Sequence, residues 1–325
     1  MTKLLVIRFS ALGDVAMAVP VVRAAALEYP ETEITVLSRK QTAGLWCDMP
    51  SNVRFFGADL KGRHKGLSGI KQLLNDIDCT RFDIVADLHG VIRSRIITLA
   101  LKIQGKKTVT IKKGRLSKWM LIHKTGKPAI TPTIERYRQV LQQAGYPVEL
   151  APVRNTNEKK DIGIAPFAAH RGKIYPLEKM EQVVKRLSRL MSAKGEKIYL
   201  FGAGEKEKNI LDNWAKTYPS VISVAGQYTM DGEIGLMRSL RLMLTMDSAN
   251  MHLASLAGTR AISIWGATHP CMGFLGYSQL PEDCIQKNLD CRPCSVYGNK
   301  KCRYMDYRCL DIEPEIIVGK IEKSL

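Results

Sequence analysis

The stretch that most restricts the fold is residues 242–270, LMLTMDSANMHLASLAGTRAISIWGATHP. It begins as an apolar run, breaks at Asp247 and Ser248, continues with helical spacing, and ends in a second apolar run. This pattern predicts a strand, a helix and a second strand of a parallel sheet, with Ser248 as the N-cap of the helix. The free N–H groups of such a helix form a phosphate site. Alternatively, Ser248 only caps the helix and His252 only packs within it.

Strand and helix patterns alternate in two successive arrays, which predicts an α/β fold with two Rossmann-like domains facing a central cleft. The first array contains expected strands over 3–9, 33–37, 53–56, 83–87 and 108–111. The second contains expected strands over 161–165, 197–201, 221–224, 242–246 and 261–265. A polar segment rich in turn residues separates the arrays and predicts domains 1–155 and 156–312. We expect residues 313–325 to form a helix that packs back toward the N-terminal domain.

The chain of 325 residues carries a net charge of +18, which predicts a polyanionic partner: nucleic acid, an anionic membrane surface or a phosphorylated substrate. Residues 101–127 contain nine Lys and Arg residues, no acidic residue, and the apolar residues 119–122. Such a charge run is either a solvated face or, as we expect around Trp119, a contact with anionic lipid headgroups. No leader or apolar run of about 20 residues is present, so we expect a cytoplasmic protein.

Polar residues also follow the strands of the first array. Asp14 comes just after the first strand, where it either favours a helix N-terminus or acts as a base at the mouth of the sheet. His89 and Arg93 follow the strand over 83–87. The dinucleotide fingerprint G-x-G-x-x-G is absent after the first strand, which argues against a nicotinamide or flavin enzyme.

Six segments, taken in order, resemble glycosyltransferase family 9, the lipopolysaccharide heptosyltransferases. They are GDV at 13–15 with Pro20, DLH at 87–89 with Arg93-Ser94, KIYP at 173–176, FGAGE at 201–205, DSANMHLA at 247–254 and WGATHP at 265–270. The resemblance spans nearly the whole chain. It implies the GT-B architecture and transfer of a heptose from ADP-heptose to a lipopolysaccharide core acceptor, with inversion at the anomeric carbon.

The resemblance also implies roles for individual residues. Asp14 matches the base, and Lys173 matches the lysine that neutralises phosphate charge. The donor side would further use Asp247 for sugar hydroxyls, with Ser248, Ala249 and the following N–H groups for the diphosphate. The nucleoside ribose would bind Glu205 or Glu207, and His252 either reaches the phosphates or packs. His89 and Arg93 would bind the acceptor.

Two positions depart from the family pattern. Ser248-Ala249 stands where the family has Thr-Gly, and Tyr175 stands where it has Trp. The alanine methyl crowds the phosphate approach, and Tyr175 alters what would be a stacking wall. These departures leave the donor open, so a family member that uses another nucleotide sugar is the alternative. Because a lysine and helix N–H groups face the phosphates, we expect no cofactor for catalysis.

Four of the eight cysteines are clustered near the C-terminus as Cys291-x2-Cys294-x7-Cys302-x6-Cys309. This is the ligand count of a structural zinc site, although the second pair lacks the C-x-x-C spacing. Reduced thiols packed in a loop are the alternative.

A basic nucleic-acid-binding protein with a zinc knuckle is the competing hypothesis from another functional class. It fails to explain Asp14 and the segment 247–252, and the basic clusters contain few aromatic residues for stacking on bases. A catalytically inactive glycan binder is a further alternative, against which Asp14 and Lys173 argue. We therefore expect a monomeric enzyme at the inner face of the cytoplasmic membrane, with a nucleotide-sugar donor, an anionic glycolipid acceptor and no nucleic acid.

Overall fold

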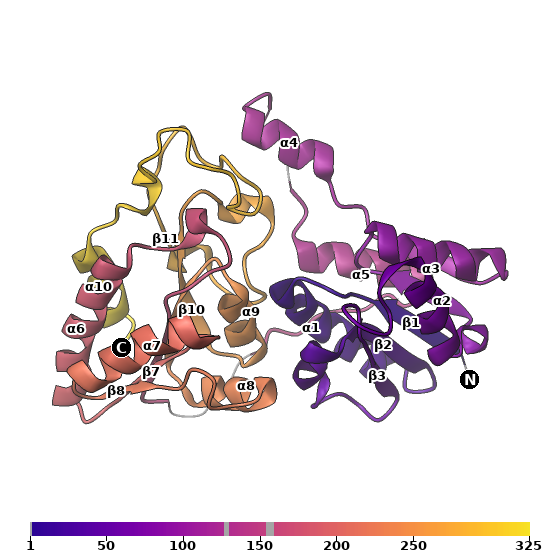
Figure 1. The fold of residues 1–325 in the computed structure, drawn as a ribbon, viewed down its shortest axis with the longest axis horizontal. Helices are drawn as coiled ribbons and strands as arrows, with labels where there is room; N and C mark the ends of the chain where they lie inside the picture. Colours follow the sequence, from indigo (N-terminus) through magenta and orange to yellow (C-terminus); the bar gives the residue numbers. More distant parts are fainter. Residues whose placement is uncertain (1, 127–129, 154–158) are drawn as a thin grey trace. The chain divides into compact units, whose positions relative to one another are not determined.

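A computed structural model describes residues 2–126, 130–153 and 159–325. The chain forms two compact units, Met1–Gly114 with Thr131–Ala151 and Arg115–Ile130 with Pro152–Leu325 (Figure 1). The units divide after residue 151, whereas the expected boundary between 155 and 156 lies outside the described residues. Each unit has its own parallel sheet and its own apolar core.

The first unit is built on a five-stranded parallel sheet in the order β3-β2-β1-β4-β5. Its strands are β1 (Lys3–Ile7), β2 (Glu33–Arg39), β3 (Val53–Ala58), β4 (Ile84–Asp87) and β5 (Lys107–Thr110). The apolar run of β1 is buried on both faces because helices cover both sides of the sheet, as in α/β proteins generally. The register pairs Leu5 of β1 with Thr35 of β2 and Val85 of β4.

Helices and 3-10 turns connect the strands of the first unit. They are α1 (Leu12–Glu28), η1 (Lys40–Trp46), α2 (Gly66–Asp76), η2 (Cys79–Arg81), α3 (Ile92–Ile103) and α5 (Thr133–Ala144). Helix α1 begins at Leu12 and retains Pro20 in its interior. Helix α5 packs against α1 and buries Tyr137 completely.

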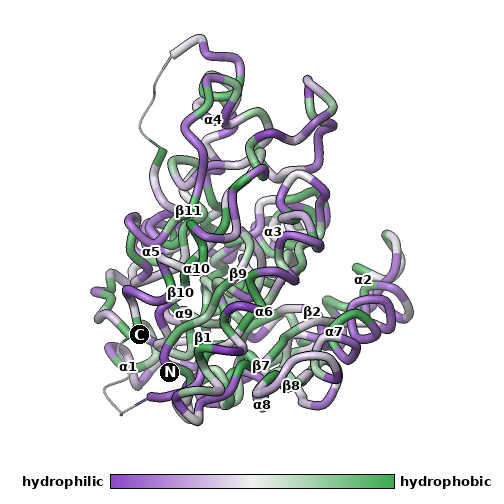
Figure 2. Tube along the Cα trace, turned by 90° about the vertical axis from the view of Figure 1, so that its left-hand side faces the viewer, coloured by the Kyte–Doolittle hydropathy of each residue, from purple (hydrophilic) through white to green (hydrophobic). Residues whose placement is uncertain are grey.

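The second unit is built on a six-stranded parallel sheet in the order β11-β10-β9-β6-β7-β8. Its strands are β6 (Ile162–Ala165), β7 (Ile198–Leu200), β8 (Val221–Ser223), β9 (Leu242–Met246), β10 (Arg260–Trp265) and β11 (Cys284–Gln286). Figure 2 colours β9 largely green, whereas the surface helix α7 (Glu205–Thr217) is rich in purple. The short strand β11 was not predicted, because three residues with one buried side chain carry no periodicity.

The remaining helices of the second unit are α4, α6, α8, α9 and α10. Their bounds are α4 (Arg115–His123), α6 (Leu177–Ala193), α8 (Met230–Ser239), α9 (Ala249–Leu256) and α10 (Pro314–Glu322). Among the described residues, no helix is long and apolar enough to cross a membrane.

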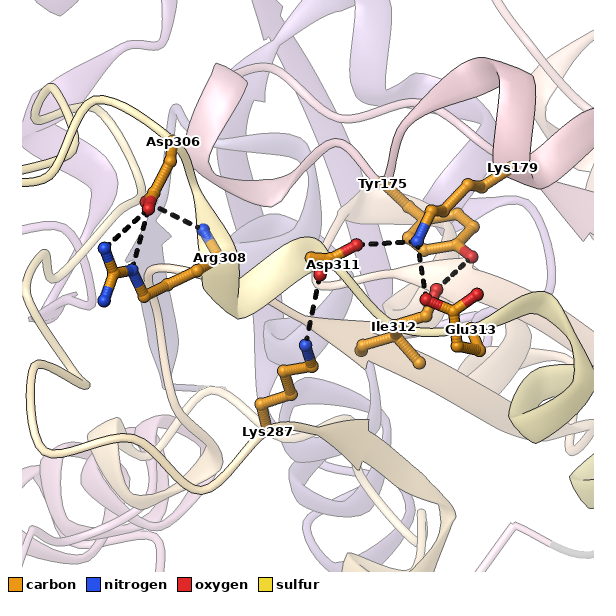
Figure 3. A network of polar contacts seen from close by, with 8 residues as sticks. All are labelled: Tyr175, Lys179, Lys287, Asp306, Arg308, Asp311, Ile312 and Glu313. Atoms are coloured by element: carbon orange, nitrogen blue, oxygen red, sulfur yellow. Dashed lines mark hydrogen bonds and ion pairs between the residues drawn. The ribbon is translucent and has the colours of Figure 1, made fainter.

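The C-terminal helix α10 belongs to the second unit. It packs against α6, where Ile317, Val318 and Ile321 join the apolar core, and its expected packing toward the N-terminal domain stays a prediction. The segment before it is also held there, because Lys179 on α6 binds the carboxylates of Asp311 at 2.6 Å and of Glu313 at 3.0 Å (Figure 3). The apolar face of α10 therefore completes the core of the unit that precedes it in the chain.

Candidate active site

The strand order of each sheet contains one point at which the chain reverses its direction of travel across the sheet. In the first sheet this point lies between β1 and β4, and in the second between β6 and β9. Open α/β sheets bind ligands at the carboxyl ends of the strands at such a point. Asp14 and His89 follow β1 and β4, while Lys173 and Asp247 follow β6 and β9. Each unit therefore carries predicted site residues where its topology favours a ligand.

Asp14 is the third residue of α1, and its carboxylate is fixed by two donors on the same oxygen. Oδ2 lies 2.5 Å from Nη2 of Arg8 and accepts the N–H of Ala11 at 3.1 Å. Arg8 is buried and also donates to the carbonyl oxygen of Leu88 at 2.7 Å. Within the described residues, Oδ1 receives no hydrogen bond, so one oxygen stays available for a substrate hydroxyl.

His89 lies beside Asp14 in the first unit. Its Nε2 is 3.4 Å from Oγ of Ser10, and its Nδ1 is buried and finds no hydrogen-bond partner among the residues that the structure describes. Burial, followed by the positive charges of Arg8 and Lys113, lowers the pKa of His89 to about 3. The imidazole is therefore neutral at physiological pH and offers hydrogen bonds to an acceptor rather than a positive charge.

The turn that presents His89 is shaped by Asp87. This buried carboxylate accepts the backbone N–H groups of His89 at 2.8 Å and of Gly90 at 2.9 Å, and the hydroxyl of Ser94 at 2.9 Å. The predicted acceptor residue Arg93 lies half-buried in the first turn of α3, which begins directly after this turn.

In the second unit, Lys173 and Asp247 form the centre of the candidate site. Nζ of Lys173 lies 2.8 Å from Oδ2 of Asp247, and the hydroxyl of Thr268 donates to the same oxygen at 2.6 Å. Asp247 is 2% exposed, so its charge depends on these partners. The ion pair links the segments that follow β6 and β9 and holds a lysine ammonium group at the switch point of the sheet.

Ser248 occupies the N-cap position of α9, as predicted, but its side chain does not cap the helix. Its Oγ is buried and has no hydrogen-bond partner in the described part of the chain. The first-turn N–H groups of α9, beginning at the half-buried Ala249, therefore receive no cap from this hydroxyl. His252, one turn further along, is 6% exposed, which favours its packing role.

The two glutamates at the start of α7 are placed differently. Glu207 folds back, and its Oε2 accepts the N–H of Ala203 at 2.8 Å, so this carboxylate is used within the loop. Glu205 is exposed in the first turn of the helix, after the turn at Gly204. Of the two predicted alternatives for the ribose, Glu205 is the one whose carboxylate faces solvent.

Arg292 is a structural part of the site that the sequence interpretation missed. Its buried guanidinium donates to the carbonyl oxygens of Gly266 at 2.6 Å, Thr268 at 2.9 Å and Trp265 at 3.1 Å. These bonds hold the loop from which Thr268 reaches Asp247. In the sequence, Arg292 is a basic residue inside the cysteine-rich segment, residues 291–309. That setting indicates an exposed loop rather than a buried guanidinium.

The backbone of the cysteine-rich segment packs closely against Lys173. Gly298 has φ +75°, and a Cβ on it would lie 2.6 Å from Cγ of Lys173. The N–H of Gly172 donates to the carbonyl oxygen of Gly298 at 3.3 Å. The cysteine-rich segment thus forms a wall of the Lys173 site.

Tyr175 lies away from this wall. It is fully buried, and its hydroxyl donates to the carbonyl oxygen of Ile312 at 2.6 Å (Figure 3). The expected stacking wall at this position is therefore absent, because Tyr175 anchors the segment before α10 instead.

The four clustered cysteines carry free thiols, and Cys309 is buried. Burial raises the pKa of the Cys309 thiol to about 11, with the positive charge of Arg292 opposing the shift. Among the described residues, no group of three or more His, Cys, Asp or Glu side chains is arranged to hold a metal ion. The arrangement does not fit a zinc site, and zinc binding stays a prediction.

Comparison with known proteins agrees with these features. A family model described as glycosyltransferase family 9 (heptosyltransferase) matches residues 70–305. The lipopolysaccharide core heptosyltransferase OpsX of Haemophilus influenzae is 24% identical over 284 residues, covering 82% of this chain and 80% of OpsX.

Solved structures of the same family share the fold. The family 9 glycosyl transferase of Veillonella parvula superimposes with a TM-score of 0.74 at 17% identity and covers 99% of this chain and 97% of its own. E. coli heptosyltransferase WaaC with ADP superimposes with a TM-score of 0.71 at 14% identity, and each chain is covered completely.

Proposed function

Because the chain belongs to glycosyltransferase family 9, the heptosyltransferases, we propose that it transfers a heptose from ADP-heptose to a lipopolysaccharide core acceptor with inversion at the anomeric carbon. The acceptor class is suggested by the similarity to OpsX, a lipopolysaccharide core heptosyltransferase. The donor is suggested by the structures of E. coli WaaC with ADP and with ADP-2-deoxy-2-fluoro heptose. The observation that carries the proposal is the pair of Lys173 and Asp247 beside the N-terminus of α9.

On the donor side, Lys173 and the N–H groups of α9 would bind the diphosphate. A lysine ammonium and a helix N-terminus both stabilise the negative charge that grows on a leaving diphosphate. Asp247 would then accept hydrogen bonds from sugar hydroxyls, and Glu205 from the ribose. Since these fixed groups supply the positive potential, we propose that catalysis needs no cofactor.

On the acceptor side, Asp14 would act as the general base. The carboxylate takes the proton of the acceptor hydroxyl while the hydroxyl oxygen bonds to the anomeric carbon. The bond from that carbon to the phosphate oxygen breaks, and its electron pair leaves with ADP. Attack opposite the leaving group inverts the anomeric centre. His89, neutral and next to Asp14, would orient the acceptor with Arg93.

The deciding experiment offers the purified protein ADP-heptose, UDP-glucose and GDP-mannose in turn, with deacylated core oligosaccharide as acceptor. We expect a mass increase of one heptose with ADP-heptose alone, and a proton NMR spectrum that shows the opposite anomeric configuration to that of the donor. Transfer from another donor with none from ADP-heptose would support the alternative of a relative that uses a different nucleotide sugar.

We further propose that the enzyme works at the inner face of the cytoplasmic membrane, where a glycolipid acceptor is embedded. The net charge of +18 supports an anionic surface as the place of work. The predicted contact residue Trp119 lies on α4, is 51% exposed and stacks on His123. Leu116 is exposed on the same helix.

A further inference from the structure

Helix α3 exposes a row of large apolar side chains. Ile92 is 81% exposed, Leu99 is 58% exposed and Ile103 is 78% exposed, whereas the half-buried Ile96 packs against the core of the first unit. Scattered single apolar residues are ordinary on a protein surface, but several in a row on one element are not.

The three exposed residues form one stripe. With about 100° of rotation per residue, the positions 92, 99 and 103 fall within roughly 40° of one another around the helix. The opposite side of α3 carries Ile97 and Leu101, both fully buried in the core of the first unit. A surface helix of a soluble protein normally has a polar outer face, whereas α3 has an apolar face on each side.

Positive charge borders the outer stripe. Arg95 and Lys102 are exposed and lie on one flank of it, roughly 40° to 60° around the helix from Leu99. Helix α3 has no acidic residue, and neither does the whole segment 88–134. Apolar residues with basic neighbours on a single helical face match the chemistry of an anionic lipid surface, which accepts the apolar groups and attracts the cations.

We propose that the outer face of α3, defined by Ile92, Leu99 and Ile103, docks on an anionic phospholipid bilayer. This rests on the proposed function, in which the acceptor is a membrane glycolipid. Helix α3 begins just after His89, at the edge of the first sheet that carries Asp14. Docking through α3 places the predicted acceptor residues next to the surface that contains the acceptor.

The charges of Arg95 and Lys102 favour a bilayer over a second copy of the chain as the partner of this face. Two copies that met through this face would bring Arg95 and Lys102 of each into one interface without a carboxylate from α3 to pair with them. Like charges at an interface oppose association. An anionic bilayer meets the same residues with charge of opposite sign.

The test is sedimentation with vesicles of phosphatidylcholine alone and of phosphatidylcholine with about 30% phosphatidylglycerol, whose anionic headgroups give the vesicle a negative surface potential. The full chain should bind the anionic vesicles, and the double variant Leu99→Asp/Ile103→Asp should lose at least about tenfold in partitioning, equivalent to about 1.4 kcal/mol. The single variant Leu99→Asp should also bind more weakly, and its charge-matched control is Leu27→Asp, which places one carboxylate at an exposed leucine of α1 and should bind as wild type does.

Three outcomes would overturn the inference. The double variant could bind anionic vesicles as well as wild type does, or binding could be lost only in the variant Leu116→Asp/Trp119→Asp on α4. The wild type could also bind no vesicles and instead form a dimer that Leu99→Asp dissociates. A parallel assay with the deacylated acceptor separates this inference from the proposed function. The double variant should transfer sugar to that acceptor at the wild-type rate. Absence of transfer by the wild type would remove the proposed function and leave the docking result standing.

Discussion

The buried guanidinium of Arg8 holds the carboxylate of Asp14 in place. Arg8 comes from the end of the first strand and reaches Oδ2 of Asp14 at 2.5 Å, while Nη1 of Arg8 is held by the carbonyl of Leu88. The guanidinium is therefore fixed before a substrate arrives. A fixed partner holds the carboxylate in one orientation, so the proposed reaction would need no reorganisation of this side chain.

We expect Asp14→Asn to lower kcat by about 10²- to 10⁴-fold, the usual contribution of a positioned general base. The amide keeps the size of the side chain but cannot take a proton. The affinity for ADP, measured by calorimetry, should stay at the wild-type value because no donor residue changes. Wild-type turnover in this variant would show that another group acts as the base.

Lys173 should matter for the donor rather than for the acceptor. A hydrogen bond to a charged group contributes about 1.5–3 kcal/mol, so Lys173→Met should weaken ADP binding by roughly 10- to 150-fold. The double variant Lys173→Met/Asp247→Asn avoids leaving a buried unpaired carboxylate and should bind ADP as weakly, with a smaller loss in Tm.

The control for this measurement is Lys179→Met. This lysine, on α6, also pairs with carboxylates of the second unit, but its partners Asp311 and Glu313 lie in the segment before α10. ADP affinity should be unchanged there. A similar loss in both variants would mean that the effect of Lys173→Met is a general destabilisation.

Among the elements, the cysteine-rich segment has the clearest structural task. Through Arg292 it holds three carbonyl oxygens of the loop after β10, and through Gly298 it packs on Lys173. The segment thus shapes the donor site without being predicted to touch the donor.

Arg292→Lys should raise the KM for the donor about tenfold. An ammonium group cannot span the carbonyls of Gly266, Trp265 and Thr268, and the loss of even one or two hydrogen bonds at about 0.5–1.5 kcal/mol each accounts for that factor. Arg260→Lys is the matched control, because it weakens the pairing of Arg260 with Asp283 elsewhere in the same unit. If both variants lower Tm and neither changes the KM, Arg292 is structural only.

Helix α8 carries a carboxyl group that makes stability depend on pH. Burial raises the pKa of Glu233 from its ordinary value of 4.5 to about 7. Between these two values the folded state binds more protons than the unfolded state, so the free energy of unfolding falls as the pH rises through this window.

Glu233→Gln should therefore raise Tm at pH 8 and leave it unchanged at pH 4. A gain of about 1 kcal/mol corresponds to about 2–4 °C for a domain of this size. Calorimetric scans of both proteins across this range measure the effect. The same Tm difference at both pH values would mean that the charge of Glu233 has no part in it.

The whole molecule has the GT-B fold, with one parallel sheet in each of its two units.

Metal analysis of the full chain tests the predicted zinc site. Because these side chains are not arranged to hold a metal ion among the described residues, we expect purified protein that is metal-free by mass spectrometry, with four titratable thiols in this segment. About one zinc per chain, lost in Cys294→Ser/Cys309→Ser and kept in Cys47→Ser at an exposed cysteine of the first unit, would establish the predicted four-thiolate site instead.

The sequence by itself determined the two arrays of strands and the positions of Asp14 and Asp247 after strands, whereas Lys173 was assigned from the family resemblance. The first two features are local: apolar runs identify buried strands, and polar residues that follow a run lie toward the carboxyl edge of a parallel sheet. The expected strands of both sheets are present, and β11 alone was missed.

Only the tertiary structure decided which side chains meet. Arg8 and Leu88, Arg292 and Gly266, and Tyr175 and Ile312 are far apart in the sequence, and no periodicity relates them. The same holds for α10, whose apolar face could have covered either unit, and for α3, whose two apolar stripes look alike in the sequence until the sheet buries one of them. Local patterns follow from the geometry of the backbone, whereas pairings across the chain depend on how the packed elements bring distant residues together.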